Sequence, residues 1–229
     1  MQNLNIIYED NHIIVVEKPV NVPSQEDKTG DIDMLTLVKQ YIKEKYNKPG
    51  EVYLGLVHRL DRPVGGIMVF ARTSKAAARL SEQVRTKQFK KKYLVIVDGK
   101  FENEKGELKD FLLKNERLNT SKVVQEGTKN SKLALLDYEV LKYNEEINLS
   151  LVKVNLHTGR HHQIRVQLAN AGHSICGDQK YGTRGRGKQI CLWAYELTLI
   201  HPIKKEEMVF KVLPEKNGSW KMLEDVSEI

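Results

Sequence analysis

The sequence predicts an α+β fold whose core is a mixed, largely antiparallel β-sheet with flanking helices and loops. Short runs of β-branched and aromatic residues recur along most of the chain, as is typical of strands. Stretches with helical periodicity stand between some of these runs, without the strict alternation of a parallel sheet. The 229 residues can bury a substantial core and fit one domain, with or without two lobes.

The first third of the chain contains two predicted strands and two predicted helices. Residues 13–16 form a β-branched run, and a polar loop with Pro and Gly follows it. Residues 34–45 carry apolar side chains at helical spacing, namely Leu35, Val38 and Ile42. Residues 66–71 predict another strand. A helix capped by Thr73 or Ser74 then runs to about Lys87, with Ala77, Leu80 and Val84 on one face.

The middle of the chain is mostly strand-like. Residues 93–97 predict a strand that ends at the turn Asp98-Gly99. Residues 100–130 are polar and weakly patterned, and either short hairpins or a mobile insertion fits them. Residues 132–142 and 147–156 predict longer strands. The apolar positions of the second change phase between Leu151 and Val152, which fits a bulge or a strand covered on both faces.

The last third predicts one helix and two closing strands. Residues 160–171 fit a helix with Ile164, Leu168 and Ala171 on one side, and Gly172 is a good terminator. Residues 190–199 and 208–213 predict the strands. No repeat or linker divides the chain, so we expect a single catalytic domain over residues 1–229.

Composition favours a polyanionic partner. Lys and Arg number 37 against 30 Asp and Glu, the formal net charge is +7 and the pI is about 9.2. Two cysteines imply no disulfide framework and favour a reducing compartment. The N-terminus resembles no signal peptide, and no apolar run approaches the roughly 20 residues of a membrane helix. We therefore expect a cytoplasmic protein that does not enter a membrane.

The segment His58-Arg59-Leu60-Asp61-Arg62 surrounds one carboxylate with cationic side chains. Nearby cations favour the ionised form of a carboxylate. An ionised Asp in basic surroundings can act as a nucleophile, a general base or a counter-ion. By itself the segment equally fits a charged surface turn, because Pro63 and two glycines follow.

A second informative segment is LHTGRHHQIRVQLANAGHSICGDQKYG, residues 156–182. Thr158-Gly159-Arg160 fits a turn into a helix. Arg165 stands among apolar residues and needs an anionic partner if it is buried, for which Asp61 is a candidate. An exposed helix-face arginine fits the spacing as well. Gly177-Asp178 and Tyr181-Gly182 fit structural turns.

Three other kinds of site do not fit. A protein kinase needs His-Arg-Asp, with Asn five residues after the Asp, and an upstream glycine-rich loop, none of which is present. The chain has no P-loop and no H-E-x-x-H motif. The three histidines at 157, 161 and 162 match no common zinc spacing, so we expect no metal.

The order HRLDR, KKYLVIVDG, LHTGRHHQIR and GD..YG resembles the RluA-type family of RNA pseudouridine synthases. The resemblance spans about residues 5–213. It implies the pseudouridine synthase fold with a bent sheet. The family's S4-like RNA-binding domain is expected to be missing, because the first strand begins close to residue 1. Departures from the family pattern at Gly65, His161, Gln167 and Ser174 concern substrate preference.

The resemblance also implies site residues and a reaction. Asp61 falls on the catalytic aspartate, and Arg165 on its basic partner. Arg59 falls on the arginine that enters the base stack when the target uridine is flipped out, and Tyr93 on the tyrosine that packs against the flipped base. The reaction moves the C1′ bond of uracil from N1 to C5 and needs no cofactor. Further RNA contacts are expected from the polar and basic side chains of Arg62, Arg160, His161, Gln163, Arg184 and Arg186.

We therefore expect an isomerase that acts on ribosomal or transfer RNA, as a monomer without an obligate protein partner. An RNA-binding module without catalysis is the second hypothesis. A hydrolytic glycosidase lacks the pair of carboxylates that it needs. Loops 100–130 and 183–189 are candidates for target recognition.

Overall fold

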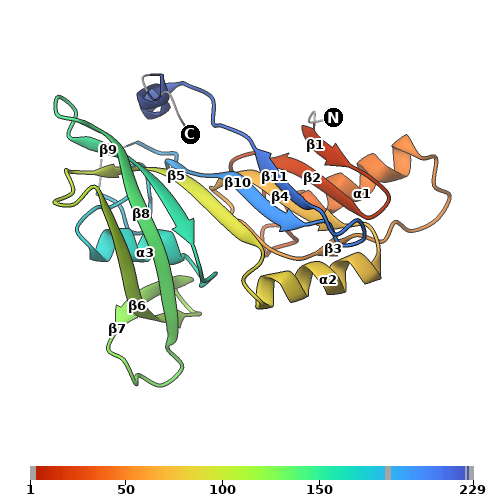
Figure 1. Cartoon of the computed structure of the whole chain (residues 1–229), viewed down its shortest axis with the longest axis horizontal. Helices are drawn as coiled ribbons and strands as arrows, with labels where there is room; N and C mark the ends of the chain where they lie inside the picture. Colours follow the sequence, from red (N-terminus) through yellow and green to blue (C-terminus); the bar gives the residue numbers. More distant parts are fainter. Residues whose placement is uncertain (1–3, 184–186, 225, 227–229) are drawn as a thin grey trace. The chain divides into compact units, whose positions relative to one another are not determined.

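The computed structural model describes residues 4–183, 187–224 and 226. This part of the chain contains eleven strands, three α-helices and one short 3-10 helix, η1 (Gly218–Leu223) (Figure 1). The chain divides into two compact units. Unit 1 comprises residues 1–90 and 194–213, and unit 2 comprises residues 91–193 and 214–229.

Unit 1 is built on a sheet with the strand order β1-β2-β4-β10, to which β3 and β11 add at β4 and β10. Antiparallel pairing joins β1 to β2, β2 to β4, β3 to β4 and β10 to β11. The strand bounds are β1 Ile6–Glu9, β2 Ile13–Lys18, β3 Gly55–Leu56, β4 Gly65–Ala71, β10 Leu192–Ile200 and β11 Glu207–Lys211.

Helix α1 (Met34–Lys45) begins and ends where the sequence predicts. The side chain of Asp33 accepts a hydrogen bond from the Thr36 amide and caps the helix. Its buried face carries Met34, Val38 and Ile42, because these positions recur at helical spacing. The apolar periodicity of residues 34–45 was therefore sufficient to predict this helix and its bounds.

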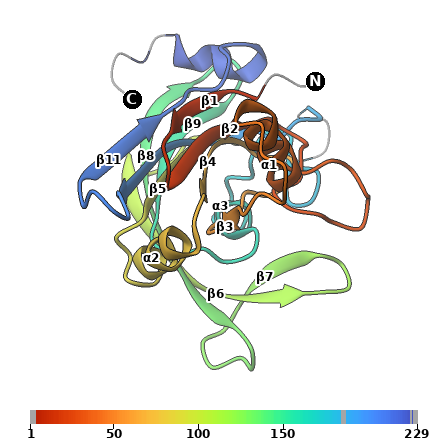
Figure 2. The same cartoon turned by 90° about the vertical axis from the view of Figure 1, so that its right-hand side faces the viewer.

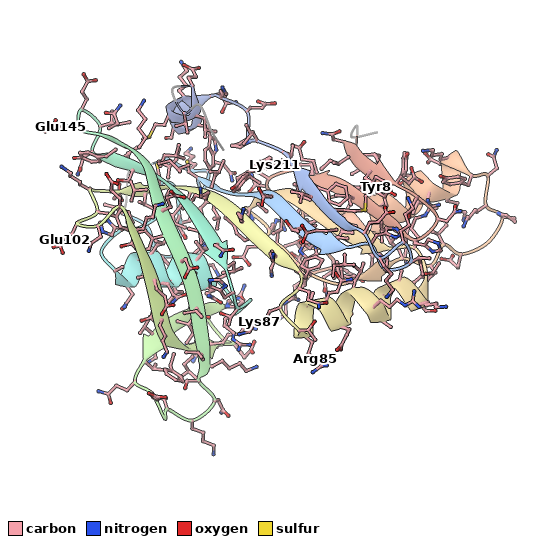
Figure 3. All side chains as sticks on the ribbon, in the orientation of Figure 1. Tyr8, Arg85, Lys87, Glu102, Glu145 and Lys211 are labelled. Carbon is pink, nitrogen blue, oxygen red and sulfur yellow. The ribbon has the colours of Figure 1, made fainter. Side chains whose placement is uncertain are left out.

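Helix α2 (Ser74–Arg85) is capped by Thr73, whose side chain accepts from the Ala76 amide. Its buried residues are Ala76, Leu80 and Gln83, so the predicted face is wrong at Val84, which is 38% exposed. Gln83 is buried because its amide binds the backbone of Ile200 in both directions, at 2.7 and 2.8 Å. Lys87, labelled in Figure 3, follows the helix in a left-handed conformation.

Apolar side chains from the sheet and α2 form the core of unit 1. Ile13, Val15, Ile67, Val69 and Leu80 are at most 1% exposed. Burying a side chain of this size contributes about 1.5–3 kcal/mol. The β2–β4 register places Lys18 opposite Gly66, directly after this core, where the candidate site begins.

Unit 2 is an antiparallel sheet with the strand order β5-β9-β8-β6-β7. Its bounds are β5 Lys90–Asp98, β6 Lys105–Asn115, β7 Thr120–Val124, β8 Lys132–Asn144 and β9 Leu149–Leu156. Strands β6 and β7 form a hairpin, which Figure 2 shows clearly. Residues 100–130 therefore follow the hairpin alternative that their polar pattern left open.

The phase change in the sequence marks an irregularity of β8. The register between β8 and β9 shifts between Val140 and Lys142, opposite Leu151 and Val152. The extra residue lies in β8, and both Leu151 and Val152 are fully buried. The bulge and the doubly covered strand are therefore both present, in neighbouring strands.

Helix α3 (Gln163–Asn170) is shorter than predicted and is not amphipathic. All residues from Gln163 to Leu168 are buried, and the helix contacts β6 and β7. Residues 160–162 form a turn instead, because the Gln163 side chain accepts from the Arg160 amide. Gly172 follows the helix with a φ of +88°, as predicted for a terminator.

The two cysteines of unit 2 are free and buried. The Cys191 amide donates to the Cys176 carbonyl at 2.9 Å. A hydrogen bond with the Cys176 thiol and burial both raise the pKa of Cys191. No helix in the described ranges is both long and apolar enough to cross a membrane. The mostly antiparallel sheet with few helices confirms the predicted fold class.

Candidate active site

Asp61 lies in a turn that connects β3 to β4 in unit 1. Its carbonyl accepts a hydrogen bond from the Val64 amide at 2.9 Å, which closes the turn around Arg62 and Pro63. Asp61 is half-buried, whereas Arg59 is exposed and Leu60 is buried. The turn therefore buries one apolar side chain and leaves the neighbouring charged groups at least partly accessible.

Ser24 fixes the backbone immediately before Asp61. Its hydroxyl donates to the Leu60 carbonyl at 2.8 Å and accepts from the Leu60 amide at 3.1 Å. A buried peptide group left without partners costs free energy. One buried hydroxyl thus satisfies both polar groups of Leu60 where no strand is available to do so.

His58 holds the same segment from its other end. Its Nε2 accepts from the Val69 amide of β4 at 3.1 Å, and its ring meets Phe89 edge-on at 5.1 Å. The accepting Nε2 must be unprotonated in this arrangement. These contacts give His58 a scaffold role.

Lys18, at the end of β2, is a fully buried cation beside the Asp61 turn. Its ammonium donates to the carbonyls of Pro19 at 2.8 Å and Arg62 at 3.0 Å. Burial lowers the pKa of Lys18 to about 7. The Arg62 charge acts in the same direction, and the Asp61 charge opposes the shift. Lys18 therefore holds the backbone after Asp61 and contributes a positive charge that depends on pH near neutrality.

Gly66 is required where the turn enters β4. Its φ of +120° is unfavourable for residues with a side chain. A Cβ at this position would lie 2.2 Å from the Ala194 carbonyl oxygen. Glycine is therefore needed both for the backbone conformation and for the close approach of β10.

The two arginines around Asp61 differ in their contacts. Arg62 donates to the Thr29 hydroxyl at 2.9 Å and pairs with the carboxylates of Asp27 and Asp31 in the preceding loop. Within the described ranges, Arg59 forms no hydrogen bond or ion pair and is exposed. Arg62 is thus anchored to the protein, and Arg59 is available to a ligand.

Arg165 of α3 is a buried cation in unit 2. Its Nε and one terminal nitrogen each donate to the carboxylate of Asp178 at 2.7 Å. The guanidinium carbon lies 5.3 Å from the centre of the Tyr181 ring. Arg165 is 4% exposed, so its need for an anionic partner is real, and Asp178 supplies one.

Electrostatics keep this pair charged and its neighbour neutral. Burial by itself would raise the pKa of Asp178, but hydrogen bonds from Arg165 outweigh it and hold the pKa below the usual range. Burial lowers the pKa of His162 to about 2, and the Arg165 charge acts in the same direction. His162 Nδ1 lies at hydrogen-bond distance, 2.9 Å, from the Tyr181 hydroxyl.

Gln163 organises the turn that precedes α3. Its side-chain oxygen accepts from the Thr158 hydroxyl at 2.8 Å and from the Arg160 amide at 3.0 Å. Its amide nitrogen donates to the Leu135 carbonyl at 3.1 Å. Gln163 is 3% exposed, and these bonds support a structural role. Arg160 is exposed and donates from Nε to the Leu133 carbonyl.

His161 connects the same turn to the β6–β7 hairpin. One ring nitrogen lies 2.9 Å from the Ser121 hydroxyl, and the other lies 3.0 Å from the Asn119 side-chain oxygen. Its ring stacks on His162 at 3.8 Å. With both nitrogens engaged, His161 serves first to hold the hairpin.

The remaining predicted residues are placed as follows. Tyr93 lies in β5 and is 6% exposed. Arg184 and Arg186 lie outside the described residues. Asp61 and Arg165 belong to different units, so their pairing stays a prediction. The described residues contain no group of three or more His, Cys, Asp or Glu side chains suited to a metal ion.

Sequence reasoning missed Lys18, Ser24, Asp178 and Tyr181. The signals were a lysine that ends an apolar strand and the pairs Gly177-Asp178 and Tyr181-Gly182, which we interpreted as turns. Both pairs do lie in turns, but their side chains also hold Arg165 and His162. A polar residue inside a turn can thus serve a distant partner.

A family model described as RNA pseudouridylate synthase matches residues 12–170. An uncharacterised RNA pseudouridine synthase from Aquifex aeolicus is 36% identical over 224 residues, which cover 91% of this chain and 69% of that protein. The dual-specificity RNA pseudouridine synthase RluA of Haemophilus influenzae is 35% identical over 217 residues, covering 90% of this chain and 91% of that protein.

A solved structure, titled human RNA pseudouridylate synthase domain containing 1, has the same fold. The TM-score is 0.76 at 26% identity, and the match covers 96% of this chain and 86% of the human chain.

Proposed function

The chain belongs to the RNA pseudouridylate synthase family, whose members are isomerases, and from this we infer a specific mechanism for it. We propose that it flips a target uridine out of an RNA stack and rearranges its C1′–N1 bond to C1′–C5 with the help of Asp61. The observation that carries the proposal is Asp61 itself, half-buried in a turn that Ser24 and Lys18 hold by its backbone. The product has the same atoms as the substrate, so the proposed reaction needs no cofactor.

The proposed role of Asp61 requires an ionised carboxylate with a defined position. Lys18 contributes positive charge near the Asp61 carboxylate. The hydrogen bonds to Leu60 and Arg62 restrict the backbone on both sides. A group held in this way loses little conformational entropy when it meets the substrate.

Base flipping gives Arg59 and Tyr93 their proposed roles. A target base in a stacked helix is inaccessible, and unstacking it costs a few kcal/mol. Arg59 is exposed and without partners among the described residues, so its planar cation can replace the lost stacking. Tyr93 would pack against the flipped uracil, as aromatic side chains do in nucleic-acid binding.

Arg165 is the proposed basic partner of Asp61. Its double hydrogen bond with the Asp178 carboxylate fixes the orientation of the guanidinium group. Asp178 would then act through Arg165 as a positioning residue. This extends the sequence-derived role of Arg165 by naming what holds it in place.

The proposed target is a uridine of ribosomal or transfer RNA. The Haemophilus influenzae relative is called a dual-specificity RNA pseudouridine synthase, which supports more than one RNA target. Arg160 is the best supported further RNA contact because it is exposed in the turn before α3. We propose that the chain is a single catalytic domain that acts as a monomer in the cytoplasm. Analytical ultracentrifugation of the purified protein tests its oligomeric state.

Asp61→Asn tests the catalytic assignment. The substitution removes the charge and keeps the shape, so isomerisation should fall by at least 10⁴-fold, on the scale of lost catalytic residues. RNA binding should stay within about threefold of the wild type, because phosphate contacts dominate affinity. Pseudouridine is quantified by mass spectrometry of unmodified ribosomal and transfer RNA transcripts after incubation.

Glu145→Gln is the matched control, since this exposed carboxylate lies in the turn between β8 and β9 (Figure 3). It should keep full activity. Retention of isomerisation in Asp61→Asn would refute the role of Asp61. A wild-type protein that binds these RNAs and modifies none would favour the binding-module hypothesis instead.

A further inference from the structure

Lys91 of β5 lies against the turn that precedes α3, within unit 2. Its ammonium is 3.4 Å from the position that a Cβ of Gly159 would occupy. Lys91 is opposite Leu156 at the end of β9, so the chain that leaves β9 passes beside it. The missing side chain of Gly159 thus keeps one side of the ammonium open.

The Lys91 ammonium has no partner among the described residues, neither a hydrogen-bond acceptor nor a carboxylate. Its side chain is only partly exposed, and burial lowers its pKa without any opposing contribution. A poorly hydrated cation without a partner is unfavourable in a folded protein. The buried cations Lys18 and Arg165, by contrast, each have close acceptors.

The position of Lys91 relates it to the target base. Side chains alternate between the two faces of a strand, so Lys91 and Tyr93 lie on the same face of β5, about 7 Å apart. Arg160, next to Gly159, is exposed and uses only Nε for its bond to Leu133. Two cationic side chains, Lys91 and Arg160, therefore border Gly159. Lys91 is the neighbour of Tyr93 on the same face of β5.

We propose that Lys91, exposed by Gly159, binds a phosphate of the RNA backbone next to the target uridine. A phosphodiester carries a full negative charge and offsets the cost of the unpartnered ammonium, which a neutral base carbonyl does less well. The inference rests on the proposed function for the identity of the nucleotide. The contact itself requires only that the protein binds RNA.

The first test measures binding to a twelve-nucleotide oligouridine RNA at several salt concentrations. Lys91→Met removes the charge and keeps the length, and it should weaken binding about tenfold. The slope of log K against log salt should become shallower by about 0.7, as for one lost phosphate contact to a single strand. Fluorescence anisotropy of labelled RNA measures both quantities.

Lys90→Met is the matched control. Lys90 is exposed, carries the same charge and lies on the opposite face of β5. It should change affinity less than twofold. Equal affinities and equal salt slopes for Lys91→Met and Lys90→Met would overturn the phosphate contact. Isomerisation by the wild type is assayed separately, so a failure of the proposed function is recognised independently.

A second test locates the phosphate. The phosphates around a uridine that the wild type modifies are replaced one at a time by uncharged methylphosphonate. One replacement should weaken binding about tenfold for the wild type and less than twofold for Lys91→Met. The variant already lacks the contact that this replacement removes, so the two losses of binding energy do not add. A loss of the same size in both proteins at every position would overturn the proposal.

Thermal unfolding separates this role from a structural one. Removing an unpartnered, poorly hydrated charge should leave the Tm of Lys91→Met unchanged or raised. If Lys91→Met lowers the Tm by more than 5 °C, the lysine is structural and the proposal fails. Gly159→Ala provides an independent variant, since its methyl group would touch the ammonium and should weaken oligouridine binding about threefold.

Discussion

Lys18 of unit 1 and Arg165 of unit 2 are both buried cations, but their surroundings differ. Lys18 donates to two backbone carbonyls, whereas Arg165 forms a double hydrogen bond with the Asp178 carboxylate. Lysine can lose its proton when it is buried, and arginine cannot. Unit 1 therefore contains a cation whose charge depends on pH, and unit 2 contains a cation that needs a permanent counter-charge.

Asp178→Asn should have the largest effect on stability. The variant leaves the Arg165 charge buried without its counter-charge, which costs about 3–5 kcal/mol. The loss is measured as the change in free energy of unfolding in urea. Asp31→Asn breaks the more exposed ion pair with Arg62 and should cost much less stability. Equal losses in the two variants would contradict the buried charge as the cause.

The second prediction concerns the pH dependence of the free energy of unfolding, to which Lys18 should contribute. Its pKa is about 7 in the folded protein, against 10.5 for a lysine side chain in water. Between these pH values the unfolded chain binds more protons, so stability rises with pH. The contribution of Lys18 should amount to about 2 kcal/mol from pH 7 to pH 9.

Unfolding in urea at several pH values measures this contribution as the difference between the wild type and Lys18→Met. The variant should lack the rise. Lys43→Met, which removes an exposed lysine of α1, should keep it. A wild type and a Lys18→Met variant with parallel pH profiles would show that Lys18 does not titrate in this range.

Ser24→Ala should reduce stability by an amount comparable to the Lys18 contribution. It leaves the amide and the carbonyl of Leu60 without partners, at a cost of about 1–3 kcal/mol. Because Leu60 precedes Asp61, kcat should fall more than the stability loss explains. Ser24→Thr keeps the hydroxyl and should restore kcat. An active Ser24→Ala enzyme with normal kcat would show that Asp61 does not need this support.

The sequence predicted elements whose determinants are local. Helix α1 begins at Met34 and ends at Lys45 because its N-cap, Asp33, and its apolar period are local in the sequence. The prediction for helix α3 was wrong in the length of the helix and in the exposure of its polar side chains. Gln163, Arg165 and Gln167 are buried because they contact residues far away in the chain. Gln167, for example, donates to Asp110 of β6 at 2.7 Å.

The candidate site divides in the same way. Asp61 and Arg59 were identified from a motif, since the residue types are adjacent in sequence. Lys18 and Asp178 are distant from the residues that they serve, by 44 positions for the Lys18–Arg62 bond and 13 for the Arg165–Asp178 pair. Spacing alone does not connect such partners, so only the folded structure reveals them.

The buried thiols make the protein convenient for site-specific labelling. Cys176 and Cys191 are at most 7% exposed, and the raised pKa of Cys191 reduces its thiolate further. Maleimide reagents should therefore ignore both native cysteines while the protein is folded. A cysteine introduced at Glu102, an exposed position labelled in Figure 3, would accept a single dye without prior removal of any native residue.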